Sequence, residues 1–303
     1  MFKSIVVGVD GREGGRDALS LAGRLALTAG GELIAVRVLP FDYYVSRAGA
    51  PPYASIAEAD ARAELQGDLE QAGLDARIDV LGDSSPARAL HSVAEAESAD
   101  LIVVGSTHHG RAGRVLAGDD AAAAIHGSPC AVAVAPRGLA SGEWKAVNRI
   151  GVGYDGRTEA RQALDLGVDL ARETGATLRV AIVVPSPIAE ADASAYDADW
   201  LERREAMAKE YLTDAIADID VPIEGQVVAG TPVSALVELS REVDLLVVGS
   251  RGWGPVRRIL VGSTAARLIR EAHCPVLVLP RGAATGEPGE RDPGTAAEQP
   301  TAA

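Results

Sequence analysis

Short runs of apolar, mostly β-branched residues alternate along the chain with longer stretches in which apolar residues recur every three or four positions. The first pattern is typical of strands covered on both faces, as in a parallel sheet, and the second of amphipathic helices. Helices are expected, among others, over residues 17–28 and 158–174. The apolar runs are SIVVGV, ELIAVRV, ARIDV, LIVVG and AVAVA in the first half, and RIGVGY, TLRVAIVV, IEGQVV, LLVVG and PVLVL in the second. This order predicts two tandem α/β domains, each a doubly wound, five-stranded parallel sheet of the Rossmann-like type.

The strongest organising feature is an internal repeat, in which the second half of the chain resembles the first at an offset of about 145 residues. SIVVGVDGREGGRDAL, beginning at Ser4, returns as RIGVGYDGRTEARQAL at Arg149. DLIVVGS, beginning at Asp100, returns as DLLVVGS at Asp244. A period of this length indicates duplicated whole domains, because the repeats of solenoid proteins are only about 20–45 residues long.

The repeat and the composition between its copies give the expected domain boundaries. We expect one domain over residues 1–138 and a second over residues 147–282. The seam between them, around residues 136–144, contains Gly, Pro and Ser. Residues 283–303 are polar and rich in Pro and Gly, which predicts a disordered tail.

Composition and charge exclude several classes of protein. Hydrophobic residues make up 47% of the 303, too many for a disordered chain, and no apolar run is long enough to span a membrane. The net charge of −14 argues against a nucleic-acid partner and against binding to an anionic membrane surface. The first residues lack the long apolar region of a signal peptide, so we expect a cytoplasmic protein. Cys130 and Cys274 do not form a disulfide framework or a CxxC site, and we expect both to pack as small buried side chains.

A glycine-rich stretch follows the fourth predicted strand of the second half, where ligands bind in open parallel sheets. Gly249 and Gly252 allow a tight turn whose backbone amides approach a phosphate closely. Gly262, Ser263 and Thr264 open the next predicted helix, so its unpaired N–H groups and the two hydroxyls face the same anion. Three arginines add positive charge to this stretch: Arg251, Arg257 and Arg258. The alternative is a glycine-rich turn that serves only the strand-to-helix geometry.

Two aspartates at the ends of the first strands are the next candidates. Asp155 ends the first predicted strand of the second half, and Asp10 is its counterpart in the first. A carboxylate here can accept hydrogen bonds from an adenine amino group or from ribose hydroxyls, or it can form an Asx turn or an N-cap for the next helix. Position alone favours neither role. The chain has no Walker A loop, no G-x-S-x-G serine, no metal-ligand spacing around His108 and no evident catalytic base.

Together these motifs resemble those of the universal stress proteins. Both halves begin with V-G-[VY]-D-G, and a glycine followed by Asp or Thr stands before the third helix, at Gly82 and Gly230. The second half adds G-x2-G-x9-G-S followed by HCPVLVLP. The similarity covers residues 3–137 and 148–281, so the chain resembles a tandem universal stress protein. The family's fold, of the adenine nucleotide α-hydrolase-like type, implies strand order 3-2-1-4-5. It also implies that the halves pair through their fifth strands. Many members form dimers, so the resemblance leaves a homodimer open.

The resemblance also implies an ATP site in the second half. Asp155 would contact the adenosine, and Val183, ending the second strand, would meet the adenine through its backbone. The residues implied to hold the phosphates are Gly249, Arg251, Gly252, Gly262, Ser263 and Thr264. The sequence leaves open whether Mg²⁺ accompanies the ATP, because no acidic pair stands out as its ligand.

The first half departs from this pattern. Gly105 and Gly118 hold the outer glycine positions, but His108 replaces the middle glycine, and Asp119, followed by Asp120, replaces the serine. Two carboxylates at a helix start would satisfy the N–H groups that a phosphate needs and would repel the phosphate. A weak first-half site would consist of Asp10, Val38, Gly105 and Gly118. We predict that the first half binds ATP weakly or not at all.

Three functions are consistent with these residues. The resemblance implies an ATP-binding regulatory protein of the stress response, in which the nucleotide shifts a conformation that an unknown partner protein recognises. The second hypothesis is an enzyme of the same fold, a slow ATPase or an adenylyl-transfer catalyst. It requires a second substrate site, for which the longer connections over residues 40–55 and 185–197 are the candidates. The third is a nucleotide-free interaction scaffold. Without a catalytic base, only slow hydrolysis is expected.

Overall fold

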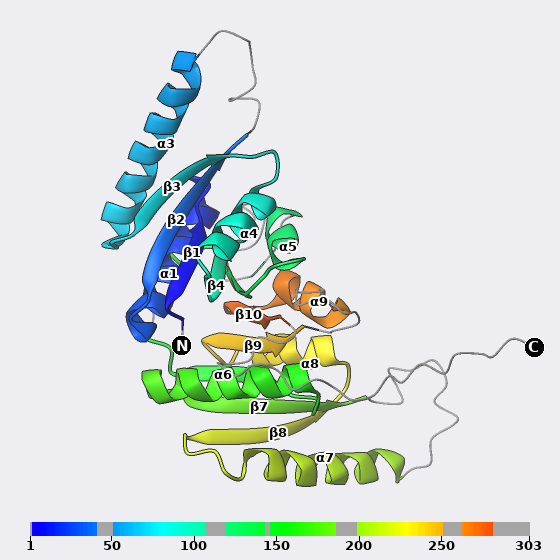
Figure 1. Cartoon of the computed structure of the whole chain (residues 1–303). Helices are drawn as coiled ribbons and strands as arrows, with labels where there is room; N and C mark the ends of the chain where they lie inside the picture. The colour runs from blue at the N-terminus through cyan, green and yellow to red at the C-terminus, as the bar shows by residue number, and fades with distance from the viewer. Residues whose placement is uncertain are drawn as a thin grey trace, which may run out of the picture.

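The computed structural model of the chain contains a ten-stranded sheet with helices on both faces (Figure 1). It describes residues 2–40, 51–106, 115, 119–142, 146–185, 199–250 and 262–280, with the backbone alone at residues 51–55, 119–120 and 263. Within the described parts of the chain, no helix combines the length and the apolar character needed to cross a membrane.

Strands and helices alternate through both halves, as the hydrophobic pattern predicts. The first half contains β1 (Ser4–Gly8), α1 (Glu13–Ala29), β2 (Glu32–Leu39), α3 (Pro51–Ala72), β3 (Arg77–Gly82), α4 (Pro86–Ala96), β4 (Leu101–Gly105), α5 (Asp119–Ile125) and β5 (Ala131–Ala135). The second half contains β6 (Arg149–Gly153), α6 (Thr158–Thr174), β7 (Thr177–Val184), α7 (Trp200–Ile216), β8 (Ile223–Ala229), α8 (Pro232–Leu239), β9 (Leu245–Gly249), α9 (Ser263–Glu271) and β10 (Val276–Leu279).

The strands are ordered β3-β2-β1-β4-β5-β10-β9-β6-β7-β8. Each half therefore has the expected order 3-2-1-4-5, with all neighbours within a half parallel. The halves meet where β5 and β10 pair antiparallel, with Ala133 opposite Leu277. The predicted doubly wound fold and the pairing through the fifth strands are both confirmed.

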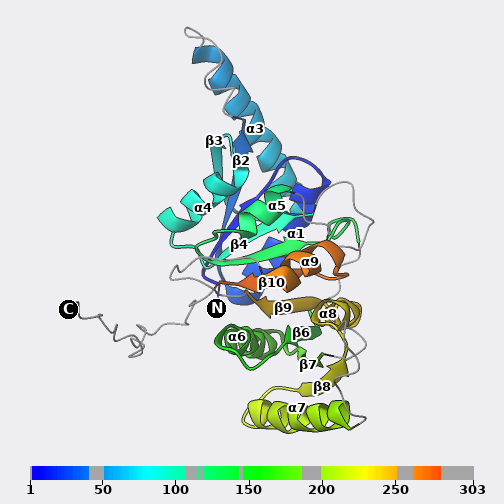
Figure 2. The same cartoon turned by 90° about the vertical axis from the view of Figure 1, so that its right-hand side faces the viewer.

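Two hydrophobic clusters lie on the two faces of the sheet, and each contains residues from both halves. One packs the sheet against α1, α3, α6 and α7, and the other against α4, α5, α8 and α9. Figure 2 shows α6 and α8 on opposite sides of the second-half strands. Because neither cluster stops at the boundary between the halves, the sheet has one continuous core on each face.

The helix bounds correct two expectations. The helix over 158–174 is observed with the expected bounds, whereas α1 begins at Glu13, ahead of the expected residue 17. The connection expected over residues 40–55 is shorter, because α3 begins at Pro51; two prolines suit a first helical turn, whose N–H groups have no intrahelical partner. Residues 41–50, 186–198 and 281–303, which include most of both connections and the expected tail, lie outside the described residues.

The seam between the halves is held against α1 by a buried carboxylate. Asp17 has no exposed surface and accepts hydrogen bonds from the backbone N–H groups of Gly138 (2.8 Å) and Ala140 (2.7 Å). The guanidinium of Arg137 also pairs with Glu13 at 3.0 Å. The chain that leaves β5 is thereby fixed before it enters the second half.

Candidate functional site

A cavity of about 510 Å³ lies at the carboxyl ends of β6, β7 and β9 and is closed by the beginnings of α6, α8 and α9. In a parallel sheet this is the edge at which loops diverge to opposite faces and leave a crevice. The cavity is lined by Gly153, Tyr154, Asp155, Arg157, Glu159, Ala160, Ala181, Val183, Pro232, Leu236, Val248, Gly249, Ser250, Thr264, Ala265 and Leu268. Four of the residues predicted from the sequence are therefore brought together: Asp155, Val183, Gly249 and Thr264.

Asp155 forms the turn that joins β6 to α6. Its Oδ1 accepts a hydrogen bond from the backbone N–H of Arg157 at 3.1 Å, and its Oδ2 pairs with the Arg157 guanidinium at 3.2 Å. The Asx-turn role left open by the sequence is thus observed. The carboxylate can still accept hydrogen bonds from a ligand, because each oxygen has two lone pairs and the side chain, 54% exposed, lines the cavity.

The apolar wall of the cavity comes from β7 and α8. Val183 is the penultimate residue of β7, one position before the strand end at which the sequence placed it. It lines the cavity together with Ala181 and with Pro232 and Leu236 of α8. This wall suits a flat apolar group rather than a charged one.

Gly249, the last residue of β9, is required by the packing of α6. A Cβ at this position would lie 2.6 Å from the backbone oxygen of Glu159. In the first half, a Cβ on Gly105 would overlap the backbone oxygen of Gly14 in the same way. The packing therefore requires glycine at this position whether or not a phosphate binds beside it.

The beginning of α9 borders the cavity. Gly262 is the N-cap and has an extended backbone (φ −67°, ψ 155°), and Ser263 is the first helical residue. Thr264 lines the cavity, and no side chain of the described residues caps this helix start. Backbone N–H groups of the first turn have no intrahelical acceptor, so they are available to a ligand. The side chain of Ser263, together with Arg251, Gly252, Arg257 and Arg258, lies outside the described residues.

The corresponding cavity of the first half measures about 150 Å³, and three of the four predicted residues line it: Asp10, Val38 and Gly105. Its wall is bulkier, because Val36 stands opposite Gly8 where Ala181 stands opposite Gly153. Asp10 forms a turn like that of Asp155, accepting from the N–H groups of Arg12 and Gly15 at 3.0 and 3.2 Å. Gly118 and His108 lie outside the described residues.

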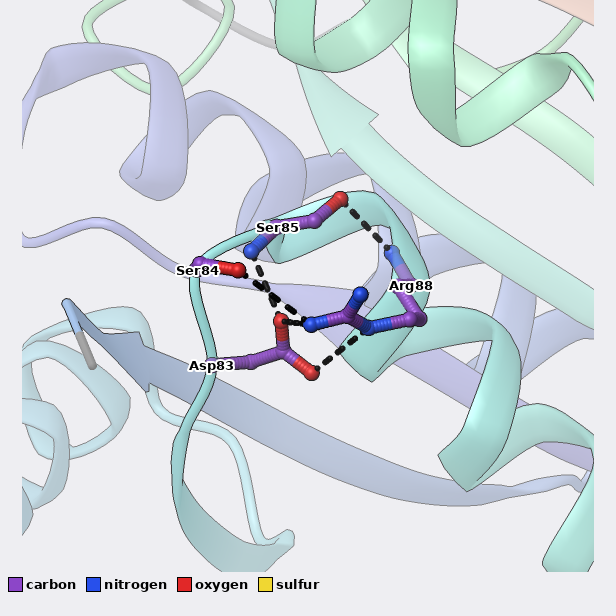
Figure 3. Close-up of polar contacts among 4 residues, drawn as sticks. All are labelled: Asp83, Ser84, Ser85 and Arg88. Atoms are coloured by element: carbon purple, nitrogen blue, oxygen red, sulfur yellow. Dashed lines mark hydrogen bonds and ion pairs between the residues drawn. The ribbon is translucent and has the colours of Figure 1, made fainter.

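The start of α4, which borders the first-half cavity, is fixed by a polar cluster (Figure 3). The Asp83 carboxylate accepts two hydrogen bonds from the Arg88 guanidinium, at 3.1 and 2.5 Å, and the Ser85 hydroxyl accepts from the Arg88 N–H at 3.3 Å. The bonds from Arg88 lower the pKa of Asp83. In the second half, Thr231 caps α8 by accepting from the N–H of Ser234 at 3.3 Å. The Asp or Thr that follows Gly82 and Gly230 thus belongs to a turn that starts a helix.

Four polar lining residues are not predicted by the sequence: Tyr154, Arg157, Glu159 and Ser250. The ring of Tyr154 stacks on that of Tyr211 from α7, with the ring centroids 5.9 Å apart. Tyr211 donates a hydrogen bond to the backbone oxygen of Gly156 at 3.4 Å and so ties α7 to the Asp155 turn. The adjacency of Tyr154 to Asp155 and of Ser250 to Gly249 is the one signal by which the sequence could have indicated them.

The remaining candidates for chemistry are the two cysteines and possible metal ligands. Cys130 and Cys274 are free and buried, as predicted. Burial raises the pKa of the Cys130 thiol to about 12 and raises that of Cys274 as well, so both stay protonated at neutral pH. Among the described residues, no three His, Cys, Asp or Glu side chains are grouped so that they could hold a metal ion.

The two α/β units, joined through their fifth strands and hollowed at the carboxyl ends of their strands, define a tandem doubly wound protein. Residues 1–136 and 146–280 each match the sequence profile of the universal stress protein family, and the chain belongs to this family.

Curated relatives and solved structures agree with this assignment. A universal stress protein of Mycobacterium tuberculosis strain H37Rv is 32% identical over 136 residues, which is 42% of this chain and 46% of that protein. A second one from the same strain is 29% identical over 201 residues, covering 63% of this chain and 68% of the relative. The match thus spans about half the length of the first relative. The crystal structure of a universal stress protein from Archaeoglobus fulgidus is similar in fold, with a TM-score of 0.68, 20% identity, and coverage of 92% of this chain and 98% of that one.

Proposed function

We propose that this universal stress protein binds ATP in its second half and acts in the stress response as a nucleotide-dependent switch that a partner protein recognises in the cytoplasm. The observation that carries the proposal is the second-half cavity, in which predicted residues of the adenosine end and of the phosphate end line one space of about 510 Å³. Pockets for small ligands commonly measure about 300–1,000 Å³, so the space is adequate for a nucleotide.

The lining supports a nucleotide at both ends. Ala181, Val183 and Leu236 offer an apolar wall to an adenine ring, and Asp155 offers carboxylate oxygens to its amino group or to the ribose. At the other end, the positive end of the α9 dipole and its free N–H groups favour an anion beside Thr264. The ring and the phosphates would thus each meet the chemistry that suits them.

Mg²⁺ fits the same arrangement. Glu159 lines the cavity, and its backbone lies against Gly249, at the phosphate end. Mg²⁺ is commonly held by one or two carboxylates together with substrate phosphates. We therefore expect ATP to bind as its magnesium complex, with the ion beside the phosphates.

The first half is proposed to have lost ATP binding. Its cavity of about 150 Å³ is below the range of ordinary ligand pockets. The chain supplies Asp119 and Asp120 as the first two residues of α5, at the positions that Ser263 and Thr264 hold in α9. Negative charge at a helix start is attracted by the same helix dipole that would favour a phosphate, and it repels the phosphate.

The switch is proposed because α9 contacts both halves. Its first turn borders the second-half cavity, and at its other end the backbone oxygen of Ala272 accepts a hydrogen bond from Val115 at 2.8 Å. Val115 is fully buried and belongs to the first-half stretch that corresponds to the phosphate motif. A shift of α9 when ATP binds would therefore displace residues of the first half. Because β5 and β10 pair within one chain, a homodimer would have to use another surface.

A Ser263→Asp substitution tests the proposal. The new carboxylate occupies the place of the terminal phosphates and repels them, so we expect ATP binding to be lost. Unfolding is not expected to be the cause, because an acidic residue in the first turn stabilises a helix. The measurement is isothermal titration with MgATP, with circular dichroism as the check on folding.

The matched variant is Asp119→Ser at the equivalent first-half position, which is expected to leave the affinity of the second half unchanged. Wild-type affinity in the Ser263→Asp variant, or no ATP binding by the wild-type protein, would contradict the proposal.

A further inference from the structure

Ser250 is a buried polar residue in the wall of the second-half cavity, directly after β9. The residue is 1% exposed, and its backbone N–H donates to the oxygen of Leu279 at 3.0 Å. Its hydroxyl oxygen has no hydrogen-bond partner among the residues that the structure describes. The backbone of Ser250 is therefore fixed, while its hydroxyl is withdrawn from bulk water and unpaired within the described part of the chain.

The first half offers an internal comparison. Ser106 occupies the same position after β4, is 5% exposed, and donates from its N–H to the oxygen of Ala135 at 3.0 Å. Its hydroxyl also donates to the oxygen of Ala135, at 2.5 Å. Burial at this position therefore does not by itself leave a serine hydroxyl unpaired. The serine whose hydroxyl has no described partner is the one beside the larger cavity, which has the size of a ligand pocket.

An unsatisfied buried hydroxyl weakens the folded state, because the desolvation of the group is not offset by a protein hydrogen bond. A ligand that supplies an acceptor removes this penalty on binding. Phosphate oxygens are acceptors, so a nucleotide in this cavity could supply the missing partner. Ser250 follows Gly249, the first glycine of the phosphate motif, so its hydroxyl lies at the phosphate end of the cavity.

We propose that the Ser250 hydroxyl donates a hydrogen bond to a phosphate oxygen of the nucleotide bound in the second half, and that the first half has turned the same hydroxyl into a structural group bonded to Ala135. The assignment rests on the proposed ATP binding. It adds a residue that favours phosphorylated nucleotides over the nucleoside.

The test compares Ser250→Ala with Ser106→Ala by isothermal titration against ATP and against adenosine. A hydrogen bond to a charged group corresponds to roughly a ten-fold to hundred-fold change in affinity, so Ser250→Ala is expected to weaken ATP binding by about that factor. Adenosine binding is expected to stay unchanged, and Ser106→Ala is expected to leave both affinities unchanged.

Thermal unfolding of the ligand-free variants gives a second readout. Ser250→Ala removes an unsatisfied hydroxyl and is expected to keep or raise the melting temperature, whereas Ser106→Ala breaks a hydrogen bond and is expected to lower it. If the Ser250→Ala protein fails to fold, Ser250→Cys keeps a side chain of similar shape with only a weak donor, and serves in the same titration.

The outcomes separate the two claims. Tight ATP binding by both the wild type and Ser250→Ala overturns the role of Ser250 and leaves the proposed function standing. An equal loss of ATP and adenosine binding also overturns it, because the hydroxyl would then contact the nucleoside. Failure of the wild type to bind any adenine nucleotide overturns both.

Discussion

Asp17 carries a buried charge that the seam between the halves needs. It has no exposed surface and accepts hydrogen bonds from two backbone N–H groups of the seam, those of Gly138 and Ala140. Burial raises its pKa above the ordinary value of 3.8, and the two backbone hydrogen bonds oppose the shift without cancelling it. This one side chain therefore anchors the linker, although its carboxylate is poorly solvated.

The raised pKa of Asp17 predicts a pH-dependent contribution to stability. In the range above pH 3.8 and below the raised value, the folded state holds a proton that the unfolded state has released, so the unfolding free energy falls as the pH rises through this window. Asp17→Asn removes the titration. Urea unfolding of both proteins from pH 4 to neutral is therefore expected to show the stability of the wild type, relative to the variant, decreasing with pH. A constant or increasing difference would refute the shift.

At the scale of elements, the starts of α1 and α6 are packed onto the ends of β4 and β9 so closely that the strand ends must be glycine. A Cβ on Gly105 would overlap the Gly14 backbone, and one on Gly249 would lie 2.6 Å from that of Glu159. Gly67, exposed within α3, has no atom within 4 Å of its ideal Cβ. Replacing glycine by alanine is therefore expected to change the stability in opposite directions at the strand ends and in α3.

Alanine substitutions test this contrast. Gly67→Ala is expected to stabilise the protein by about 0.5–1 kcal/mol, because alanine loses less backbone entropy in a helix. Gly105→Ala is expected to destabilise it by about 1–3 kcal/mol, the usual range for overpacking against a neighbour that cannot relax freely. Urea unfolding followed by circular dichroism measures both. Equal effects of the two substitutions would show that the packing at β4 is not tight.

The elements also show what the sequence could and could not predict. α6 was predicted with both its bounds because a periodic apolar face runs up to Gly175, whose left-handed backbone (φ 71°) ends the helix. The start of α3 was missed because Pro, Tyr and Ser read as a loop. The contact of Gly249 with Glu159 is tertiary, so no local pattern reveals it. The same applies to Ser250 and Ser106, which follow identical VVG segments yet differ in hydroxyl bonding.

At the scale of the whole molecule, duplication has produced one sheet with two unequal cavities. The pairing of β5 with β10 and the contact of Val115 with Ala272 join the halves through backbone hydrogen bonds. The net charge of −14 is distributed unevenly around the two motifs: three arginines stand in the second, and two aspartates open the first-half helix. The chain is thus proposed to use one half for the nucleotide and the other to respond to it.

The central claim is that each chain holds one ATP, in the second half. Native mass spectrometry of the full chain equilibrated with MgATP counts the bound molecules directly. We expect a single bound nucleotide per chain over the range of concentrations in which the first site saturates, and none in the Ser263→Asp variant. Two nucleotides bound per chain with equal affinity, or no bound nucleotide, would contradict the account.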